Sequence, residues 1–279
     1  MKISEAFDMY IQEYLILKSG SEGTIEHYQK YKKSLCECLG DIRLEEVDLE
    51  AISKWNNALL KGRSGNTVRE YLCGLRMLLK YCSLRGFDCL NYGLVPVPKR
   101  TPVIPTFLTK EEVSLMIDNA CNARSAFVVS LLYSSGIRLS EMLALNRGQI
   151  VNRKFTVVGK GKKPRLCFID KRTEDLMNEY LKARTDKNNA LVVSKDKKRM
   201  TATNVQLLVS NAARNAGLAH KHIHPHTLRH SFATNFLENN GNMRYLSTLM
   251  GHANLNTTAM YAHVVDVDLE NQYKRFHSI

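Results

Sequence analysis

The sequence predicts a mainly helical protein with two domains, the second of which also holds a small antiparallel sheet. Apolar residues recur at helical spacing over most of the 279 residues. Four of the six prolines fall within residues 95–105, where they separate two helical regions. Two β-rich runs flank the segment from Lys160 to Pro164, which is typical of a hairpin.

The first domain, residues 1–94, is predicted to be a four-helix unit. Breaks that contain glycine and polar residues interrupt the apolar pattern at 19–23, 40–41 and 61–66. The helices between these breaks are expected at Ile3–Leu15, Tyr28–Leu39, Leu49–Leu60 and from the residue after Asn66 to near Gly86.

Residues 95–107 are predicted to be a linker between the domains. Proline cannot continue a helix, and it biases the preceding residue towards extended geometry, so this stretch should be semi-rigid. Lys99 and Arg100 lie in its middle. Their charges suit a strap along a phosphate backbone, although a solvated linker is equally consistent with them.

The second domain, residues 108–279, is predicted to combine helices with the hairpin. Thr109 and Glu112 form a capping-box pattern that indicates a helix start. A second helix should run from Phe127 to Tyr133. The strands are expected at 155–159 and 165–169, and the remainder reads as mostly helical.

The net charge of +13 is concentrated in the second part of the chain. Residues 1–100 carry 15 basic and 13 acidic side chains, whereas the remaining 179 carry 25 basic and 14 acidic ones. Such an excess favours a polyanionic partner, because each Lys or Arg that meets a phosphate releases condensed counterions. A soluble basic protein without such a partner is the alternative.

Other classes of protein are disfavoured by the composition. No apolar run approaches the roughly 18 residues that a membrane-spanning helix needs. The N-terminal segment carries acidic residues among apolar ones, which predicts an amphipathic helix and not a signal peptide. Seven cysteines, without a Cys-x-x-Cys pair, indicate reduced thiols in a cytoplasm.

Three clusters of residues suggest a phosphate-binding site. Arg138 follows Gly136 at an expected helix start, where free N–H groups favour an anion, and Glu141 is placed to support it. His226 and Arg229 share one helical face directly after Pro225. Read alone, Arg138 is more often a surface arginine paired with Glu141, and His226 and Arg229 are as often packing residues.

The third cluster combines a histidine with a late tyrosine. Gly251 and His252 should break one helix, and Tyr261 follows nine residues after His252 on the next. Tyr261 is the natural candidate for a covalent nucleophile in this set, with a buried core tyrosine as the alternative. At the hairpin tip, Lys160 either reaches the site as an acid or is solvated. Lys162, Lys163 and Arg165 are expected on backbone phosphates. The alternating His220, His222 and His224 lack a cysteine or carboxylate partner, so no metal site is predicted.

Together these motifs resemble the tyrosine recombinases of the phage-integrase family, close to the compact Xer type. Four boxes carry the resemblance, which extends over essentially the whole chain: Gly136-Ile137-Arg138-Leu139-Ser140-Glu141, Gly159-Lys160-Gly161, His226-Thr227-Leu228-Arg229-His230, and Leu249-Met250-Gly251-His252 followed by Thr257-Thr258 and Tyr261. The resemblance implies a SAM-like core-binding domain followed by an α+β catalytic domain.

The resemblance also implies a mechanism and partners. Tyr261 would form a 3′-phosphotyrosyl link while Arg138, Arg229 and His252 hold the phosphate, Lys160 protonates the leaving 5′-oxygen and His226 assists proton transfer. No cofactor is implied. The partner would be duplex DNA with short inverted core sites, gripped in the first domain by Lys61, Arg63, Asn66 and Arg69.

Oligomeric state and location follow from the same resemblance. A homotetramer on DNA would exchange C-terminal tails through Leu269, Tyr273 and Phe276, with a partner recombinase left open. Docking of the tail on its own domain is the alternative. The protein would act on the nucleoid in the cytoplasm. A type IB topoisomerase and a non-catalytic DNA-binding protein of the same fold are the alternatives. The sequence does not reveal the target DNA or the biological role.

Overall fold

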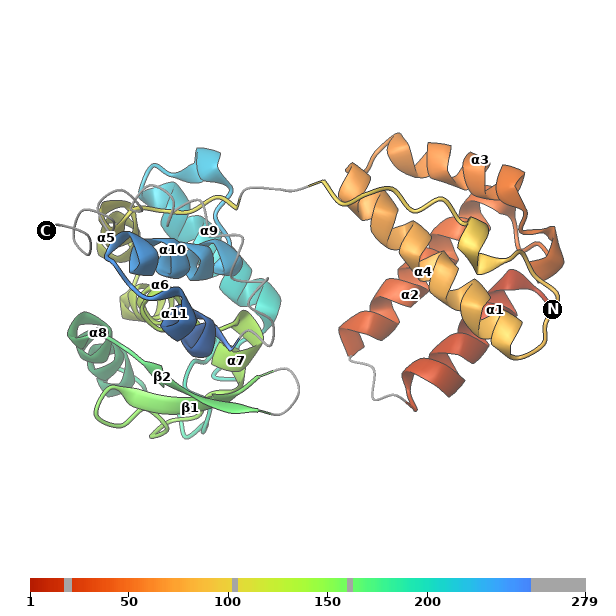
Figure 1. The fold of residues 1–279 in the computed structure, drawn as a ribbon. Helices are drawn as coiled ribbons and strands as arrows, with labels where there is room; N and C mark the ends of the chain where they lie inside the picture. The colour runs from red at the N-terminus through yellow and green to blue at the C-terminus, as the bar shows by residue number, and fades with distance from the viewer. Residues whose placement is uncertain (18–21, 102–104, 160–162, 252–279) are drawn as a thin grey trace, which may run out of the picture. The chain divides into compact units, whose positions relative to one another are not determined.

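The computed structural model describes residues 1–17, 22–101, 105–159 and 163–251 (Figure 1). The chain divides into two compact units, an N-terminal unit of residues 1–103 and a C-terminal unit of residues 104–279. The division falls inside the stretch predicted as a linker. Among the described residues, no helix is both long enough and apolar enough to cross a membrane.

The N-terminal unit contains the expected helices, with one local difference. The first helical segment begins as the α-helix α1 and continues as a π-helix from Tyr10 to Leu15. Asp48 and Ser64 cap α3 and α4 by accepting hydrogen bonds from the backbone N–H groups of Ala51 and Thr67. The α-helices are α1 (Ile3–Met9), α2 (Glu22–Leu39), α3 (Leu49–Leu60) and α4 (Gly65–Leu84).

Aromatic side chains dominate the core of the N-terminal unit. Trp55 is fully buried, and its ring nitrogen donates a hydrogen bond to Ser34 over 3.2 Å. Rings from α2 and α4 pack against the first helical segment, with centroids 4.9 Å apart for Tyr10 and Tyr28 and 5.2 Å apart for Tyr10 and Tyr81. Such contacts bury large apolar areas while the hydroxyl groups keep polar partners.

The C-terminal unit is built around one buried helix, α6. Core residues on every side of this helix, such as Phe127, Val128 and Leu131, are fully buried, which is the pattern of a central helix. Helices α5, α8, α9 and α10 all contact it. The predicted capping box of Thr109 and Glu112 is present at the start of α5. The helices described in this unit are α5 (Lys110–Asp118), α6 (Ala123–Ser135), α7 (Leu139–Ala144), α8 (Lys171–Lys182), α9 (Ala202–Asn215), α10 (Pro225–Glu238) and α11 (Met243–Met250).

The predicted hairpin forms the sheet of the C-terminal unit. Strands β1 (Lys154–Val158) and β2 (Pro164–Phe168) pair antiparallel, with Phe155 opposite Cys167. Phe155, Val157 and Cys167 are buried on the inward face, as the alternation of strand side chains requires. Helix α11 contacts both α10 and β2, as Figure 1 shows, which brings the hairpin close to the end of α11.

Candidate active site

The C-terminal end of α6 turns sharply and delivers Arg138. Gly136 ends the helix in a left-handed conformation with φ +60°. A Cβ atom at this position would lie 2.3 Å from a ring carbon of Phe232. Only glycine accepts both the positive φ and this close approach without strain. The turn places Arg138 at the N-cap of α7.

Arg138 is held by the carboxylate of Glu141. Its backbone N–H donates to one oxygen over 2.7 Å, and its guanidinium donates to the other over 3.0 Å. The contact expected between these two residues is therefore present. The Arg138 side chain is 30% exposed, whereas that of Glu141 is 5% exposed. The carboxylate thus orients the arginine from the protein side and leaves part of the guanidinium open.

Arg165 does not have the environment expected of a residue that contacts DNA. Its side chain is 8% exposed and donates two hydrogen bonds to the two oxygens of Glu141, over 2.8 and 2.6 Å. Its Nε donates to the carbonyl oxygen of Leu249 over 2.8 Å. We therefore correct the sequence interpretation, because the charge of this guanidinium is paired with a buried carboxylate. One sequence signal was available, since Arg165 shares a strand face with the apolar Cys167.

Glu141 is ionised because two arginines surround it. Burial alone would raise the pKa of this carboxyl group, but the hydrogen bonds from Arg165 and from the backbone N–H of Arg138 outweigh burial. The resulting pKa is about 2. The carboxylate offsets part of the positive charge of the two arginines, so that both can occupy the same small region.

Arg229 connects the C-terminal ends of α6 and α11 in the same region. Its guanidinium donates to the carbonyl oxygen of Gly136 over 2.5 Å and to that of Met250 over 2.7 Å, and the residue is 5% exposed. Gly136 lies two residues before Arg138, and Met250 is the last residue of α11. Arg229 therefore fixes the end of α11 against the turn that carries Arg138.

His226 lies in the first turn of α10, whose first residue is the predicted Pro225. Loss of water around the ring is the largest cause of a lowered pKa for His226, and the charges of His224, Arg229 and Arg138 lower it further. His226 is nevertheless an exposed residue, so its imidazole is open to solvent, and the lowered pKa favours the neutral ring at neutral pH. His230 is partly buried, and burial lowers its pKa to about 4.

Two chain segments with predicted functional residues begin at this arginine region. A Cβ atom at Gly159 would lie 3.2 Å from Arg165 and 3.5 Å from Glu141, and one at Gly251 would lie 2.9 Å from Arg165. We call Arg138, Glu141, Gly159, Arg165 and Gly251 the Glu141 cluster. The predicted residues Lys160, Lys162, His252 and Tyr261 lie outside the described residues, and they follow Gly159 and Gly251 in the sequence.

The residues predicted to contact DNA from the N-terminal unit and the linker have varied environments. Lys61, Lys99 and Arg100 are exposed, as is Lys163 in the hairpin, while the guanidinium of Arg63 lies 5.0 Å from the ring centre of Tyr71. Asn66 exchanges two hydrogen bonds with the backbone of Thr101, over 2.9 and 3.0 Å. Its amide therefore clamps the linker. Arg69 is half-buried in a groove beside Tyr31.

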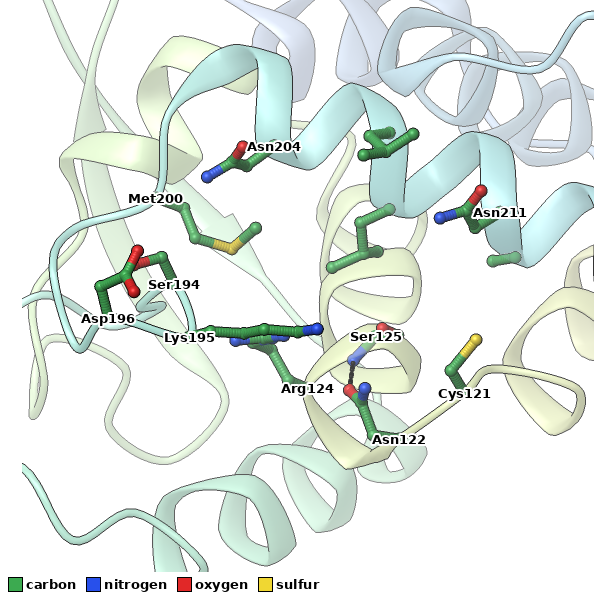
Figure 2. A pocket seen from close by; sticks show the side chains of 13 residues that line it. Cys121, Asn122, Arg124, Ser125, Ser194, Lys195, Asp196, Met200, Asn204 and Asn211 are labelled. Carbon is green, nitrogen blue, oxygen red and sulfur yellow. Dashed lines mark hydrogen bonds between the residues drawn. The ribbon is translucent and has the colours of Figure 1, made fainter.

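A separate pocket of 390 Å³ lies at the opposite end of α6. Figure 2 shows it between α9 and the first turn of α6, with Arg124, Lys195 and Asn204 among its lining residues. Because α6 has 13 residues, its two ends are about 20 Å apart. This pocket is therefore distinct from the Glu141 cluster.

The alternating histidines do not form a metal site in the described residues. No group of three histidine, cysteine, aspartate or glutamate side chains comes close enough there to hold an ion. His224 instead caps α10, because its ring accepts a hydrogen bond from the N–H of Thr227.

Two family models match the chain. Residues 106–267 match the phage integrase family, and residues 3–86 match the phage integrase SAM-like domain. The tyrosine recombinase XerC of Psychromonas ingrahamii is 32% identical over 97% of this chain and 95% of its own length.

Solved structures share the fold. The XerH site-specific recombinase bound to palindromic difH substrate aligns with a TM-score of 0.75 at 20% identity, covering 99% of this chain and 85% of the other. The Tn1549 transposon integrase in complex with transposon right end DNA aligns with a TM-score of 0.79 at 19% identity, covering both chains completely.

Proposed function

The chain belongs to the phage integrase family and is a tyrosine site-specific recombinase, and on this premise we propose how its residues divide the chemistry. The hydroxyl of Tyr261 attacks the scissile phosphodiester and forms a new phosphorus–oxygen bond. The bond to the 5′-oxygen breaks, which leaves a 3′-phosphotyrosyl link and a free 5′-hydroxyl. Attack by a 5′-hydroxyl from another strand reverses these steps and rejoins the DNA.

Arg138, Arg229 and His252 bind the non-bridging oxygens and offset the charge that develops in the transition state. The observation that carries this assignment is the tie between Arg229 and the backbone of Gly136, two residues before Arg138. This tie fixes both guanidinium groups in one small region before DNA binds, and the two carbonyl partners of Arg229, unlike the carboxylate partner of Arg165, carry no net charge. Such preorganised cations need no rearrangement during the reaction.

Two further residues move protons. Lys160 donates a proton to the departing 5′-oxygen, and its place directly after Gly159 supports this role because Gly159 adjoins the Glu141 cluster. His226 accepts the proton of the Tyr261 hydroxyl, and its lowered pKa leaves the ring unprotonated and available as an acceptor at neutral pH. No metal ion takes part in these steps.

Replacement of the nucleophile tests the assignment. Tyr261→Phe removes one hydroxyl group, so the variant should bind DNA with nearly unchanged affinity and should form no covalent adduct. The measurement is an SDS-resistant protein–DNA complex on a cleavable site, with and without EDTA. An adduct formed by the Phe variant would exclude Tyr261, and loss of the wild-type adduct in EDTA would contradict metal-free chemistry.

The partner is duplex DNA with short inverted core sites, and the protein acts on the nucleoid in the cytoplasm. The net charge of +13 supports a polyanionic partner. Lys61, Arg63 and Arg69 supply contacts from the N-terminal unit, and Lys99, Arg100 and Lys163 supply further contacts. Asn66 is better suited to holding the linker, because both ends of its amide bond Thr101.

Four protomers assemble on two sites by exchange of C-terminal tails. A pocket of 350 Å³ lined by the half-buried rings of Phe232 and Phe236, together with Tyr133, offers an apolar acceptor. The tail residues Leu269, Tyr273 and Phe276 lie outside the described residues and form its occupant. Phe236→Ala should reduce the tetramer fraction on DNA in sedimentation, whereas Phe87→Ala in the other unit should not. Unchanged tetramers in Phe236→Ala would contradict this docking site.

A further inference from the structure

All three nitrogens of the Arg165 guanidinium have partners in the protein. Two of them donate to the two oxygens of Glu141, and Nε donates to the carbonyl oxygen of Leu249. These partners lie 24 residues before Arg165 and 84 residues after it. One side chain on β2 therefore joins α7 to the end of α11.

The first of these ties concerns the orientation of Arg138. Glu141 accepts hydrogen bonds from both Arg165 and Arg138, and its own side chain is 5% exposed. Movement of Arg165 towards a DNA phosphate would leave Glu141 without its bidentate partner in a dry environment, which is costly. Arg165 is therefore held inside, while Arg138 keeps the open side.

The second tie concerns the end of α11. Leu249 accepts a hydrogen bond from Arg165, and Met250 accepts one from Arg229. Gly251 then leaves the helix in a left-handed conformation with φ +63°, where a Cβ atom would lie 2.9 Å from Arg165. The last turn of α11 is thus fixed by two arginines and packs directly on one of them.

We propose that Arg165 is a positioning residue, which fixes the last turn of α11 to the carboxylate that orients Arg138. The inference rests on the proposed function, because the segment that leaves this turn carries His252 and Tyr261. Only nine residues lie between Gly251 and Tyr261, so the position of Gly251 limits the positions that the nucleophile can reach. A displacement of about 1 Å can reduce a reaction rate about 100-fold.

The test separates positioning from DNA binding. Arg165→Ala should bind a core site with a Kd within about threefold of wild type, because no DNA contact is removed. Its single-turnover rate of adduct formation at saturating DNA should fall about 100-fold. Arg165→Lys retains a cation but cannot make the bidentate contact, so its rate should lie between those of wild type and Arg165→Ala. A Kd raised tenfold or more with a normal rate at saturation would overturn the proposal and restore Arg165 as a DNA contact.

A second substrate identifies which element Arg165 positions. DNA with a sulfur atom in place of the scissile 5′-oxygen has a leaving group that needs no proton. Lys160→Ala should therefore regain cleavage on this DNA, whereas Arg165→Ala should stay slow because the attack itself is impaired. Full recovery of Arg165→Ala on the sulfur substrate would overturn the proposal, since Arg165 would then act only through the lysine.

Two controls keep the result interpretable. Arg172→Ala removes another arginine that pairs with a carboxylate, Asp118, at the surface of the same unit, and its cleavage rate should be unchanged. Arg165→Met combined with Glu141→Gln avoids an unpaired buried charge and should fold even where Arg165→Ala does not. Wild-type cleavage by this double variant would overturn the proposal. An adduct formed by Tyr261→Phe would contradict the proposed nucleophile alone. The role of Arg165 would still be decided by the rates of its own variants.

Discussion

The two units use charged residues in opposite ways. In the N-terminal unit the buried residues are hydrophobic, and most ion pairs, such as Arg43 with Glu45, lie at the surface. In the C-terminal unit, Arg165, Glu141 and Arg229 are nearly buried and hydrogen-bonded to one another or to backbone carbonyls. Exposed pairs contribute little to stability, whereas a buried pair is costly to break on one side only. The described ion pairs of the N-terminal unit should therefore be dispensable, whereas the buried pair of Arg165 with Glu141 in the C-terminal unit should be essential.

The largest expected effect is that of Glu141→Ala. The change leaves Arg165 buried without its carboxylate, which should lower the free energy of unfolding by about 3–5 kcal/mol. Trp55 is the only tryptophan of the chain and belongs to the N-terminal unit, so its fluorescence reports that unit alone. In urea, the circular dichroism transition of the C-terminal unit should move to lower concentration while the Trp55 transition stays in place. A shift of both transitions, or of neither, would contradict the claim that the buried pair stabilises the C-terminal unit alone.

Acid should weaken the C-terminal unit through the same carboxylate. The pKa of Glu141 is about 2 in the folded protein against an ordinary value of 4.5. Because the pKa is lower in the folded than in the unfolded state, ionised Glu141 stabilises the folded state. This contribution is complete above about pH 4.5 and is lost as the pH falls through about 2. The difference corresponds to about 3 kcal/mol. Urea titrations at pH 5 and pH 2.5 should show a larger loss for wild type than for Glu141→Gln, and equal losses would contradict the assignment.

Local features of the fold were predictable from the sequence. The third helix was expected at Leu49–Leu60 and is found there. Apolar periodicity depends only on residues close in the sequence, so it can be recognised without knowing the fold. The Thr109 cap and the hairpin strands depend on equally local signals. The change from α-helix to π-helix at Tyr10 was not predictable, since the residues buried in the π-helix, Tyr10, Ile11 and Leu15, also fit the apolar spacing of an α-helix.

The grouping of Arg138, His226 and Arg229 was predictable from the motifs, but their contacts were not. The motifs identified Arg138, His226 and Arg229, but the lysines around the hairpin tip suggested that Arg165 faced DNA. Its actual partners are 24 and 84 residues away, and no local pattern encodes such distances. Asn66 illustrates the same limit, because its partner Thr101 is 35 residues away.

The smallest expected effect is that of Glu13→Ala in the N-terminal unit. Glu13 accepts a hydrogen bond from the hydroxyl of Tyr81 over 2.7 Å and pairs with Arg85 over 3.0 Å, yet its side chain is 43% exposed. Water can replace both contacts, so the free energy of unfolding measured by Trp55 fluorescence should fall by less than about 1 kcal/mol. Burial, more than the carboxylate of Glu13, raises the pKa of Tyr81 to about 12. A loss of about 3 kcal/mol or more would mean that the N-terminal unit also depends on a carboxylate, as the C-terminal unit depends on Glu141.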